Sequence, residues 1–276
     1  MKSRLLVSFS GGRTSAYMLW WILNNCKDEY DIVVVFANTG KEHEGTLKFV
    51  QQCSEYFDVE IVWVEGYPKS EKGWAVEHRV VNYETASRSG EPFEAMIVKL
   101  GIPSTNAPFC SDQLKRLPIE SYMKSIGWDS YYKAIGIRAD ELDRINENWK
   151  SKRIYYPLVK VGVLKRDVVL FWSAMPFDLD IPKELGNCDA CWKKGFNVLT
   201  EIARNEPSIF DWWIDMGYKY GGLNPRNAEL LPPFNFYRNN KSPIDIIEMA
   251  KRPFTELELF PDFRTTASCG ETCEID

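Results

Sequence analysis

Residues 5–15 predict a strand, a glycine-rich turn and the start of a helix: Leu5-Leu6-Val7-Ser8-Phe9-Ser10-Gly11-Gly12-Arg13-Thr14-Ser15. An apolar run rich in β-forming residues stops at residue 10, and residues 16–23 continue at once with a helix-compatible apolar pattern. Two glycines allow a tight turn and a close approach of the backbone to a ligand. The N–H groups of such a turn and of the following helix N-terminus form an anion site, to which the hydroxyls of Ser10, Thr14 and Ser15 add donors. The alternative is an ordinary strand-to-helix turn with Thr14 or Ser15 as the N-cap.

The first half of the chain alternates apolar strands with helical patterns, which predicts a parallel sheet with helices on both faces. The strands and helices expected after the first unit cover residues 31–37, 42–56, 59–64, 131–137, 153–156 and 165–173. The fold class is therefore α/β, with a doubly wound, mostly parallel, five-stranded sheet. Ligands of such sheets lie at the carboxyl ends of the strands. The turn at residues 10–15 and Asn38-Thr39-Gly40 both follow a strand, and their convergence favours the phosphate-binding interpretation.

The composition of the chain excludes some classes of function. The 276 residues carry a formal charge of −5, which excludes the global basic field of a non-specific nucleic-acid binder. No apolar run is long enough to span a membrane, and residues 1–4 lead into a strand rather than a signal peptide. We therefore expect a cytoplasmic protein with no membrane partner. We expect a nucleotide-binding domain over residues 1–217 and a C-terminal extension over residues 218–276, which reads as an extended tail.

Residues 66–108 read as an irregular insertion of the kind that forms lids and substrate loops. Within it, His78 and Arg79 are expected on a solvated face. A helix is predicted to start near Ser111 or Asp112, because polar N-cap residues precede its apolar positions. Cys110 would then lie at a helix N-terminus, where the pKa of a thiol is lowered and a ligand or nucleophile role is favoured.

Two arginines follow the strand predicted at residues 131–137. Arg138 and Arg144 stand at the expected ligand edge, where guanidinium groups bind phosphate in a bidentate way. A single arginine is more often a surface charge, so the pair is what indicates a phosphate clamp.

Seven cysteines in a reducing compartment favour thiols, a metal or a cluster over a disulfide framework. Cys188-Asp189-Ala190-Cys191 places two thiolates within reach of one metal, although structural zinc, a redox dithiol and a cluster all use this spacing. Because no second Cys-x-x-Cys exists, further ligands would come from Cys110 and from one of the C-terminal cysteines, Cys269 or Cys273. Cys26 and Cys53 lie on apolar helical patterns and are expected to be buried core thiols.

Together these motifs resemble the phosphoadenosine phosphosulfate (PAPS) reductase family within the adenine nucleotide α-hydrolase-like superfamily. The matching residues occur in family order over residues 4–218: residues 10–15, residues 38–42, Cys110 with Lys115 and Pro118, residues 136–144 and residues 186–191. The resemblance implies the adenine nucleotide α-hydrolase-like fold with a helical, cysteine-bearing C-terminal extension. It also implies nucleotide contacts from Ser8, Ser10, Gly11, Gly12, Arg13, Thr14, Ser15, Asn38, Thr39, Gly40, Gly136, Arg138 and Arg144.

The family holds two chemistries. Sulfonucleotide reductases use a C-terminal cysteine, often in Glu-Cys-Gly-Leu-His, and tend to have a degenerate phosphate loop. Here Ser268-Cys269-Gly270-Glu271 lacks the preceding Glu and the following Leu-His, whereas the loop keeps the full Ser-Gly-Gly-x-x-Ser pattern. That loop is similar to the ATP pyrophosphatase branch. Thr14 replaces the acidic residue which that branch often carries before the final Ser, and this puts the handling of a metal in question.

The resemblance therefore implies an enzyme that cleaves ATP to AMP and pyrophosphate and activates an acceptor, such as DNA or tRNA, for sulfur incorporation. Ser15 and Arg138 would act at the phosphates with Mg²⁺, and a cysteine desulfurase would supply sulfur. Cys110, Cys188, Cys191 and Cys273 would hold a [4Fe–4S] cluster, with zinc as the alternative, and Cys269 would be a further catalytic thiol. The first alternative is a PAPS or APS reductase with Cys269 as nucleophile and thioredoxin as reductant. The second is a non-catalytic nucleotide-binding protein with structural zinc.

Overall fold

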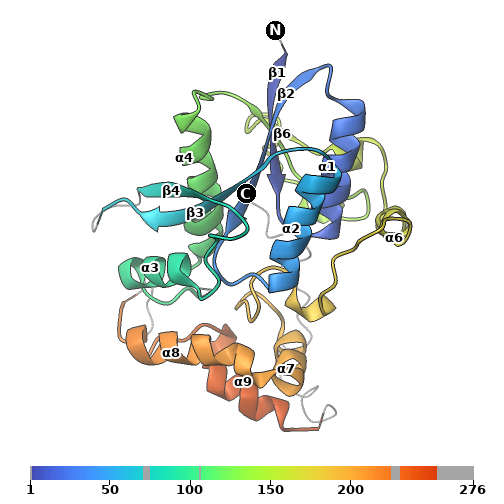
Figure 1. Cartoon of the computed structure of the whole chain (residues 1–276). Coiled ribbons are helices and arrows are strands. Elements are labelled where there is room, and N and C mark those ends of the chain that lie inside the picture. The colour runs from blue at the N-terminus through green and yellow to red at the C-terminus, as the bar shows by residue number, and fades with distance from the viewer. Residues whose placement is uncertain (1, 71–74, 106, 225–230, 254–276) are drawn as a thin grey trace.

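A computed structural model of the chain describes residues 2–70, 75–105, 107–224 and 231–253. Within them, six strands form one sheet in the order β4-β3-β2-β1-β5-β6 (Figure 1). Neighbouring strands are parallel except β3 and β4, which are antiparallel. The strands are β1 (Ser3–Phe9), β2 (Tyr30–Asn38), β3 (Ile61–Pro68), β4 (Val76–Val81), β5 (Tyr132–Ala134) and β6 (Ile154–Tyr155).

The strand order places the switch point of the winding between β1 and β5. The chain runs from β1 outward through β2 and β3, and later returns to the other side of β1 with β5 and β6. Val7 of β1 is in register with Val34 of β2 on one side and with Ala134 of β5 on the other. The turn at residues 10–15 and the segment that begins at Gly136 therefore leave the sheet side by side, where ligands of such folds bind.

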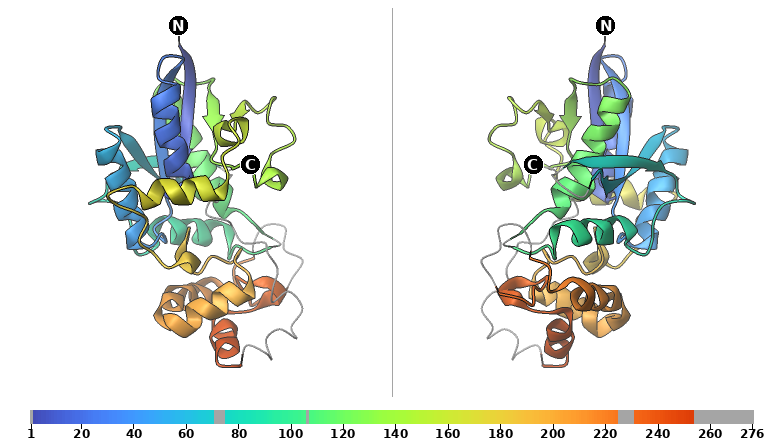
Figure 2. Two further views of the ribbon diagram at one scale, coloured as in Figure 1. Left: turned by 90° about the vertical axis from the view of Figure 1, so that its right-hand side faces the viewer. Right: turned by 90° about the vertical axis from the view of Figure 1, so that its left-hand side faces the viewer.

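Helices cover both faces of the sheet, as the predicted doubly wound arrangement requires (Figure 2). Alternate residues of a strand point to opposite faces. Leu5, Val7 and Phe9 of β1 belong to a core that includes residues of α1 (Arg13–Asn25), α2 (Glu44–Tyr56) and α6 (Lys165–Ser173). Leu6 of β1 belongs to a second core with Ile119 and Met123 of α4 (Leu117–Ser125).

All five predicted strands are confirmed, but the interpretation of residues 66–108 as irregular is wrong. This segment contains β4 and α3 (Glu91–Leu100). Strand β4 is an edge strand whose residues are all exposed or half-buried, so it lacks the apolar run by which the inner strands are recognised. His78 is half-buried and hydrogen-bonded to the Ser121 hydroxyl at 2.8 Å, so its predicted solvated face is also wrong. Arg79 is exposed, as predicted, and lies over the ring of Tyr67.

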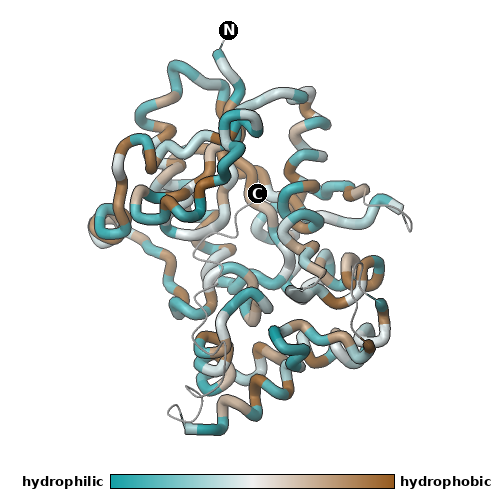
Figure 3. Tube along the Cα trace, turned by 180° about the vertical axis from the view of Figure 1, so that it is seen from behind, coloured by the Kyte–Doolittle hydropathy of each residue, from teal (hydrophilic) through white to brown (hydrophobic). Residues whose placement is uncertain are grey.

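A separate layer of helices packs below the sheet (Figures 1 and 3). Its core joins α3 to α7 (Phe196–Asn205), α8 (Asp211–Tyr220) and α9 (Pro243–Ala250). In Figure 3, hydrophobic and hydrophilic segments alternate along these helices, as expected for amphipathic elements. Helix α9 agrees with the helical extension that the family resemblance implies, and it contradicts the extended tail that the proline-rich composition of residues 221–276 indicates. The helix has only eight residues, and the sequence marks only its start. Ser242 caps it by accepting a hydrogen bond from the Asp245 N–H at 3.1 Å, and Pro243 is its first residue.

Short helical turns complete the described chain, and none of its helices combines the length and the apolar character needed to cross a membrane. The predicted helix near residue 111 begins at Cys110 and passes through a π-helical turn, η1, before α4. Such turns are rare and are frequent at functional sites. The short elements are η1 (Asp112–Arg116), η2 (Leu142–Arg144), α5 (Pro157–Lys160), η3 (Lys183–Leu185), η4 (Pro207–Phe210) and η5 (Arg238–Asn240).

Candidate functional site

The turn after β1 has the backbone geometry of an anion site. Gly11 has φ +80°, and a Cβ there would lie 2.8 Å from the Thr46 methyl group, so this position requires glycine. Gly12 is the N-cap of α1, which has neither a side-chain cap nor an acidic residue in its first turn. The N–H groups of a first helical turn have no partner within the helix, so they are available to a negatively charged group.

Hydroxyl groups fix the shape of this turn from inside. The Ser15 hydroxyl donates to the Gly12 carbonyl at 2.9 Å and accepts from the Ser10 hydroxyl at 3.0 Å. Ser15 is buried, and Ser8 is half-buried near the end of β1. A Cβ on Gly136 would lie 3.2 Å from the Ser15 Cα, so the exit of β5 passes close against the N-terminus of α1. The predicted residues Ser10, Ser15 and Gly136 are thus brought together.

Arg138 lies against the same helix N-terminus and is only 7% exposed. Its Nη1 donates to the Thr14 hydroxyl at 3.0 Å, and its Nε donates to Asp140 at 3.0 Å. Glu141 lies 3.3 Å from Arg138 and also pairs with Arg144. The two predicted arginines therefore share a carboxylate, and Arg138 is hydrogen-bonded to the phosphate turn.

Arg13 forms the outer wall of the site. Its guanidinium makes two hydrogen bonds to the Asp178 carboxylate, at 2.6 and 3.0 Å, and one to the Leu179 carbonyl at 2.7 Å. A pocket of about 350 Å³ opens beside it, between the start of α1, the segment after β5 and α6. Sequence reasoning missed the contributions from α6, because no local pattern links that helix to the turn. The pocket is lined by Arg13, Thr14, Arg138, Lys165, Val168, Val169, Trp172, Ser173 and Asp178.

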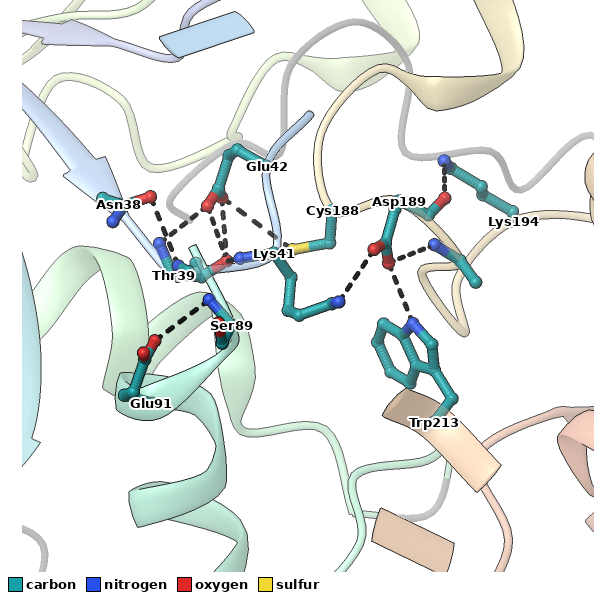
Figure 4. A network of polar contacts seen from close by, with 12 residues as sticks. Asn38, Thr39, Lys41, Glu42, Ser89, Glu91, Cys188, Asp189, Lys194 and Trp213 are labelled. Atoms are coloured by element: carbon teal, nitrogen blue, oxygen red, sulfur yellow. Dashed lines mark hydrogen bonds and ion pairs between the residues drawn. The ribbon is translucent and has the colours of Figure 1, made fainter. Parts of the chain in front are cut away.

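The polar side chains of the turn after β2 point inward (Figure 4). Asn38 is fully buried; its amide donates to the Glu65 carboxylate at 2.6 Å, and its oxygen accepts from the Gly40 N–H at 3.2 Å. Glu42 accepts from the Thr39 N–H at 2.8 Å. The side chains of Asn38 and Thr39, which were predicted to contact a nucleotide, thus hold the backbone of this turn in place.

Glu65 is a residue that sequence reasoning missed. This buried carboxylate accepts hydrogen bonds from the Asn38 amide, from the Ser87 N–H at 2.7 Å and hydroxyl at 2.9 Å, and from the Tyr67 hydroxyl at 3.2 Å. It ties the ends of β2 and β3 to the loop that leads into α3. The available signal was a single acidic residue within the apolar run of β3.

The Cys-x-x-Cys loop docks onto the turn after β2 (Figure 4). Glu42 and Cys188 form an isolated antiparallel bridge, and the Asp189 N–H donates to the Lys41 carbonyl at 2.9 Å. The Lys41 ammonium lies 2.9 Å from the Asp189 carboxylate. The Cys188 sulfur lies 3.4 Å from the Thr39 hydroxyl. These contacts hold the Cys188 thiol at the carboxyl end of β2, one strand away from the phosphate turn.

The surroundings of Cys188 favour its protonated form. Burial raises the pKa of this thiol well above its ordinary value, and the nearby Glu42 carboxylate raises it further. The positive charge of Lys115 and the Thr39 hydroxyl act in the opposite direction, without reversing the shift.

The predicted cluster ligands are only partly assembled. Cys110 is half-buried at the start of its helix. The neighbouring Ser111 hydroxyl accepts a hydrogen bond at 2.7 Å from Lys193, which lies two residues after Cys191. Within the described ranges, however, no three His, Cys, Asp or Glu side chains are gathered so as to hold a metal ion. Cys269 and Cys273 lie outside the described residues. The residues described do not by themselves fit a cluster or a zinc ion, and both stay predictions. Cys26 and Cys53 are buried, as predicted.

A magnesium ion held by the protein at the phosphate turn fits no better. The nearby carboxylates of Asp140, Glu141 and Asp178 are each paired with an arginine. No three acidic side chains of the described chain form a group for a cation.

Three relatives and one family model match the chain. Residues 4–143 match the phosphoadenosine phosphosulfate reductase domain. The nin region protein ORF290 of Escherichia phage lambda is 31% identical over 286 residues, which cover 98% of this chain and 94% of that protein. Two Methanocaldococcus jannaschii proteins, MJ0066 and MJ0973, are 23% and 22% identical over 80% and 78% of the chain. The alignments cover 42% and 47% of those two proteins, less than half of each. The chain belongs to the phosphoadenosine phosphosulfate reductase domain family, and its sheet has the adenine nucleotide α-hydrolase-like fold of that family.

Proposed function

We propose that this chain cleaves ATP to AMP and pyrophosphate and so activates an acceptor for sulfur incorporation. Its family supports a nucleotide-using enzyme of sulfur chemistry. The observation that carries the proposal is the position of the Cys188 thiol, which Thr39 and the Glu42 bridge hold at the carboxyl end of β2. Strand β2 is the neighbour of β1, so a sulfur atom and a phosphate turn share one edge of the sheet.

In the proposed reaction, an acceptor oxygen attacks the α-phosphorus of ATP, the bond to the bridging oxygen breaks, and pyrophosphate leaves. Negative charge grows on the leaving group. The N–H groups at the start of α1 and the Arg138 guanidinium are positioned to stabilise that charge. A sulfur nucleophile then displaces AMP together with the acceptor oxygen. Where that nucleophile is the terminal sulfur of a persulfide, a second thiol then cleaves the S–S bond, which leaves the sulfur on the acceptor and forms a disulfide. The proposed acceptor is DNA or tRNA, with a cysteine desulfurase as sulfur donor.

The second candidate is a sulfonucleotide reductase. The description of the matching family favours it. There, Cys269 would attack the sulfonyl sulfur, and thioredoxin would release sulfite from the resulting thiosulfonate. Cys269 lies outside the described residues; the first candidate is the one that the positions of Cys188 and of the phosphate turn support.

The two candidates are separated by their products. Protein purified anaerobically is incubated with ATP and bulk tRNA or DNA, and separately with PAPS and reduced thioredoxin. We expect AMP and pyrophosphate in the first reaction, lost in Arg138→Met and retained in Cys269→Ser. We expect sulfur transfer, measured with labelled cysteine and a desulfurase, to be lost in Cys188→Ser and retained in Cys53→Ser, which alters a buried core thiol. Sulfite release that depends on Cys269, without ATP cleavage, would establish the reductase instead. Turnover of neither nucleotide would leave a non-catalytic nucleotide-binding protein.

A further inference from the structure

We propose that a groove at the amino end of the sheet binds single-stranded nucleic acid. The groove has a volume of about 600 Å³ and lies between α4, the turn that follows it, β5 and Arg153, which directly precedes β6. Phosphates would lie against its cations and bases against its aromatic rings. The inference rests on the proposed function in one respect: it gives the nucleic acid proposed as acceptor a binding surface apart from the ATP site.

The groove and the phosphate turn lie at opposite edges of the sheet. Strands β1, β5 and β6 are parallel; the phosphate turn follows β1, whereas Tyr131 precedes β5 and Arg153 precedes β6. Figure 1 shows the N-terminus, where β1 begins, on the side of the molecule away from α7, α8 and α9. Strand β1 has seven residues, so at about 3.3 Å per residue the two edges are about 20 Å apart. A nucleic acid in the groove would therefore leave the ATP site open, and a polymer is long enough to reach both edges.

Two aromatic side chains line the groove. Trp128 and Tyr131 are half-buried, and their ring centroids are 6.3 Å apart. The Arg4 guanidinium lies 5.4 Å from the Trp128 ring centroid. Neither the Trp128 indole N–H nor the Tyr131 hydroxyl is hydrogen-bonded to a residue that the structure describes. Burial, with the nearby Glu120 charge, raises the pKa of Tyr131 to about 12, so its hydroxyl keeps its proton at neutral pH. An unpaired base offers a ring surface and hydrogen-bond acceptors to such groups, whereas a duplex stacks its ring surfaces inside.

The acidic side chain on the α4 wall of the groove is already neutralised. One oxygen of Glu120 lies 3.2 Å from Lys133, and the other lies 3.0 Å from Arg116, which also pairs with Asp112. These four side chains carry no net charge between them. Lys124, one turn after Glu120 on the same helix, is exposed and forms no ion pair within the described chain. Its ammonium group is therefore available to a ligand.

A basic turn continues the groove past its far wall. Its residues, Trp149-Lys150-Ser151-Lys152-Arg153, are all exposed and include three cations and no acid. None of these cations forms an ion pair with a described residue, and the Arg153 guanidinium donates to the Ser130 hydroxyl of the groove. The Lys150 ammonium lies 5.3 Å from the Trp149 ring centroid. Basic and aromatic side chains along one groove are typical of proteins that bind single strands.

The charges of this surface favour a polyanion. Lys124 and the three cations of the basic turn have no ion-pair partner among the described residues, and neither do the exposed carboxylates of Asp129, which lines the groove, and Glu147. Four such cations against two such carboxylates leave a local positive excess on a chain whose net charge is −5. Asp129 opposes phosphate at its own position, so removing its charge should strengthen binding.

The experiment measures the binding of labelled oligothymidylate and oligouridylate to the full chain by fluorescence anisotropy. In about 50 mM salt, single strands of about twelve nucleotides should bind at least about fivefold more tightly than a duplex of equal length. Lys124→Ala and Arg153→Gly should each weaken binding at least about threefold and lower the slope of log Kd against log salt by about 0.7. Asp129→Asn should tighten it. Lys251→Ala, at the end of α9, is the control and should bind like the wild type.

Arg153→Gly separates binding from folding. Arg153 has φ +54°, in the left-handed region that glycine adopts more easily than a residue with a side chain. The variant should therefore unfold in urea no more readily than the wild type while it binds the strand more weakly.

The site of binding is tested by competition. Excess ATP should change the Kd of the strand by less than about twofold, because the two sites lie at opposite edges. Displacement of the strand by ATP, or wild-type affinity in both Lys124→Ala and Arg153→Gly, would overturn the inference. A duplex that binds as tightly as the single strand, or AMP that competes with the affinity of the oligomer, would overturn it as well. If ATP is cleaved but no strand binds, the inference fails while the proposed function stands. If the strand binds in the groove but ATP is never cleaved, the proposed function fails while the inference stands.

Discussion

Gly136 and Ser15 lie so close that a methyl group on Gly136 would be 3.2 Å from the Ser15 Cα and 3.4 Å from its nitrogen. Both contacts are with backbone atoms at the start of α1, which cannot rotate aside as a side chain can. Gly136→Ala should therefore push the phosphate turn away from β5. We expect a loss of about 1–3 kcal/mol in unfolding free energy, as in other overpacked sites, and weaker nucleotide binding. Urea unfolding and calorimetry measure the two effects.

Gly217→Ala is the matched control for this substitution. Gly217 lies within α8, and a Cβ there would meet no atom within 4 Å. Alanine is the better helix former by up to about 1 kcal/mol, so this variant should be as stable as the wild type or more so. Nucleotide affinity should not change. If both variants behaved alike, the close approach of Gly136 to Ser15 would have no bearing on the site.

The ion pair between Lys41 and Asp189 should be essential for docking the Cys-x-x-Cys loop. Their side chains are only 10% and 16% exposed, and Asp189 also accepts from the Trp213 indole at 2.8 Å. Removing one partner leaves a buried charge uncompensated, which costs about 3–5 kcal/mol. Lys41→Met and Asp189→Asn should each lower the free energy of unfolding, measured with urea, by about this amount. The double variant should lower it by less than the sum of the two single effects.

Loss of this docking should also expose Cys188. Alkylation of Cys188, followed by mass spectrometry, should be faster in Lys41→Met than in the wild type, whereas the core thiol Cys53 should be modified equally slowly in both. The exposed pair of Lys219 and Asp215 is the control, and Lys219→Met should change neither stability nor Cys188 alkylation. Additive destabilisation in the double variant would show that the two groups act independently.

The elements that the sequence predicted correctly are those encoded by neighbouring residues or by a periodic apolar pattern. The five apolar strands, α6 and the turn at residues 10–15 are confirmed because each is encoded by neighbouring residues. What it could not predict depends on distant contacts. Thr39 and Cys188 are 149 residues apart, and the α6 wall of the pocket lies 150 residues beyond the phosphate turn in numbering. The edge strand β4 was missed because half-exposed residues carry no apolar signal, and Glu65 because a buried acid is recognisable only with its donors.

Asp140 should make the stability of the site depend on acid pH. Burial raises the pKa of this carboxyl, but the hydrogen bond and charge of Arg138 and the N–H groups of Asp140 and Lys165 outweigh it, so its pKa lies below the ordinary value. A carboxyl with a lowered pKa in the folded state stabilises the protein above its unfolded pKa, about 3.9, and this contribution is lost as the pH falls through the folded-state value.

Asp140→Asn should therefore melt at a lower temperature than the wild type at pH 7, and the difference should shrink below about pH 4. Thermal unfolding followed by circular dichroism from pH 7 to pH 3 measures it. Asp112→Asn, in an exposed i,i+4 pair with Arg116, controls for the general effect of removing a carboxylate. A difference that stays constant over the whole range would mean that Asp140 acts through packing rather than through its charge.

Glu65 should support nucleotide binding although it lies inside the protein. It is 2% exposed and accepts four hydrogen bonds from Asn38, Ser87 and Tyr67. Glu65→Gln keeps the volume but removes the negative charge to which all four donors are bonded and replaces one acceptor oxygen by an N–H₂ group, which costs about 1–3 kcal/mol. A weaker bond to the Asn38 amide loosens the side chain whose oxygen holds the Gly40 N–H and the turn after β2.

We therefore expect Glu65→Gln to weaken nucleotide binding even at temperatures where circular dichroism shows it fully folded. Glu77→Gln, half-exposed on β4, should leave both properties unchanged. Ser87→Ala removes one of the four hydrogen bonds and should give an intermediate loss of stability, because the backbone N–H of residue 87 still binds Glu65. If Glu65→Gln were destabilised yet bound nucleotide with wild-type affinity, the turn after β2 would be part of the scaffold alone, and the phosphate site would be confined to the segments after β1 and β5.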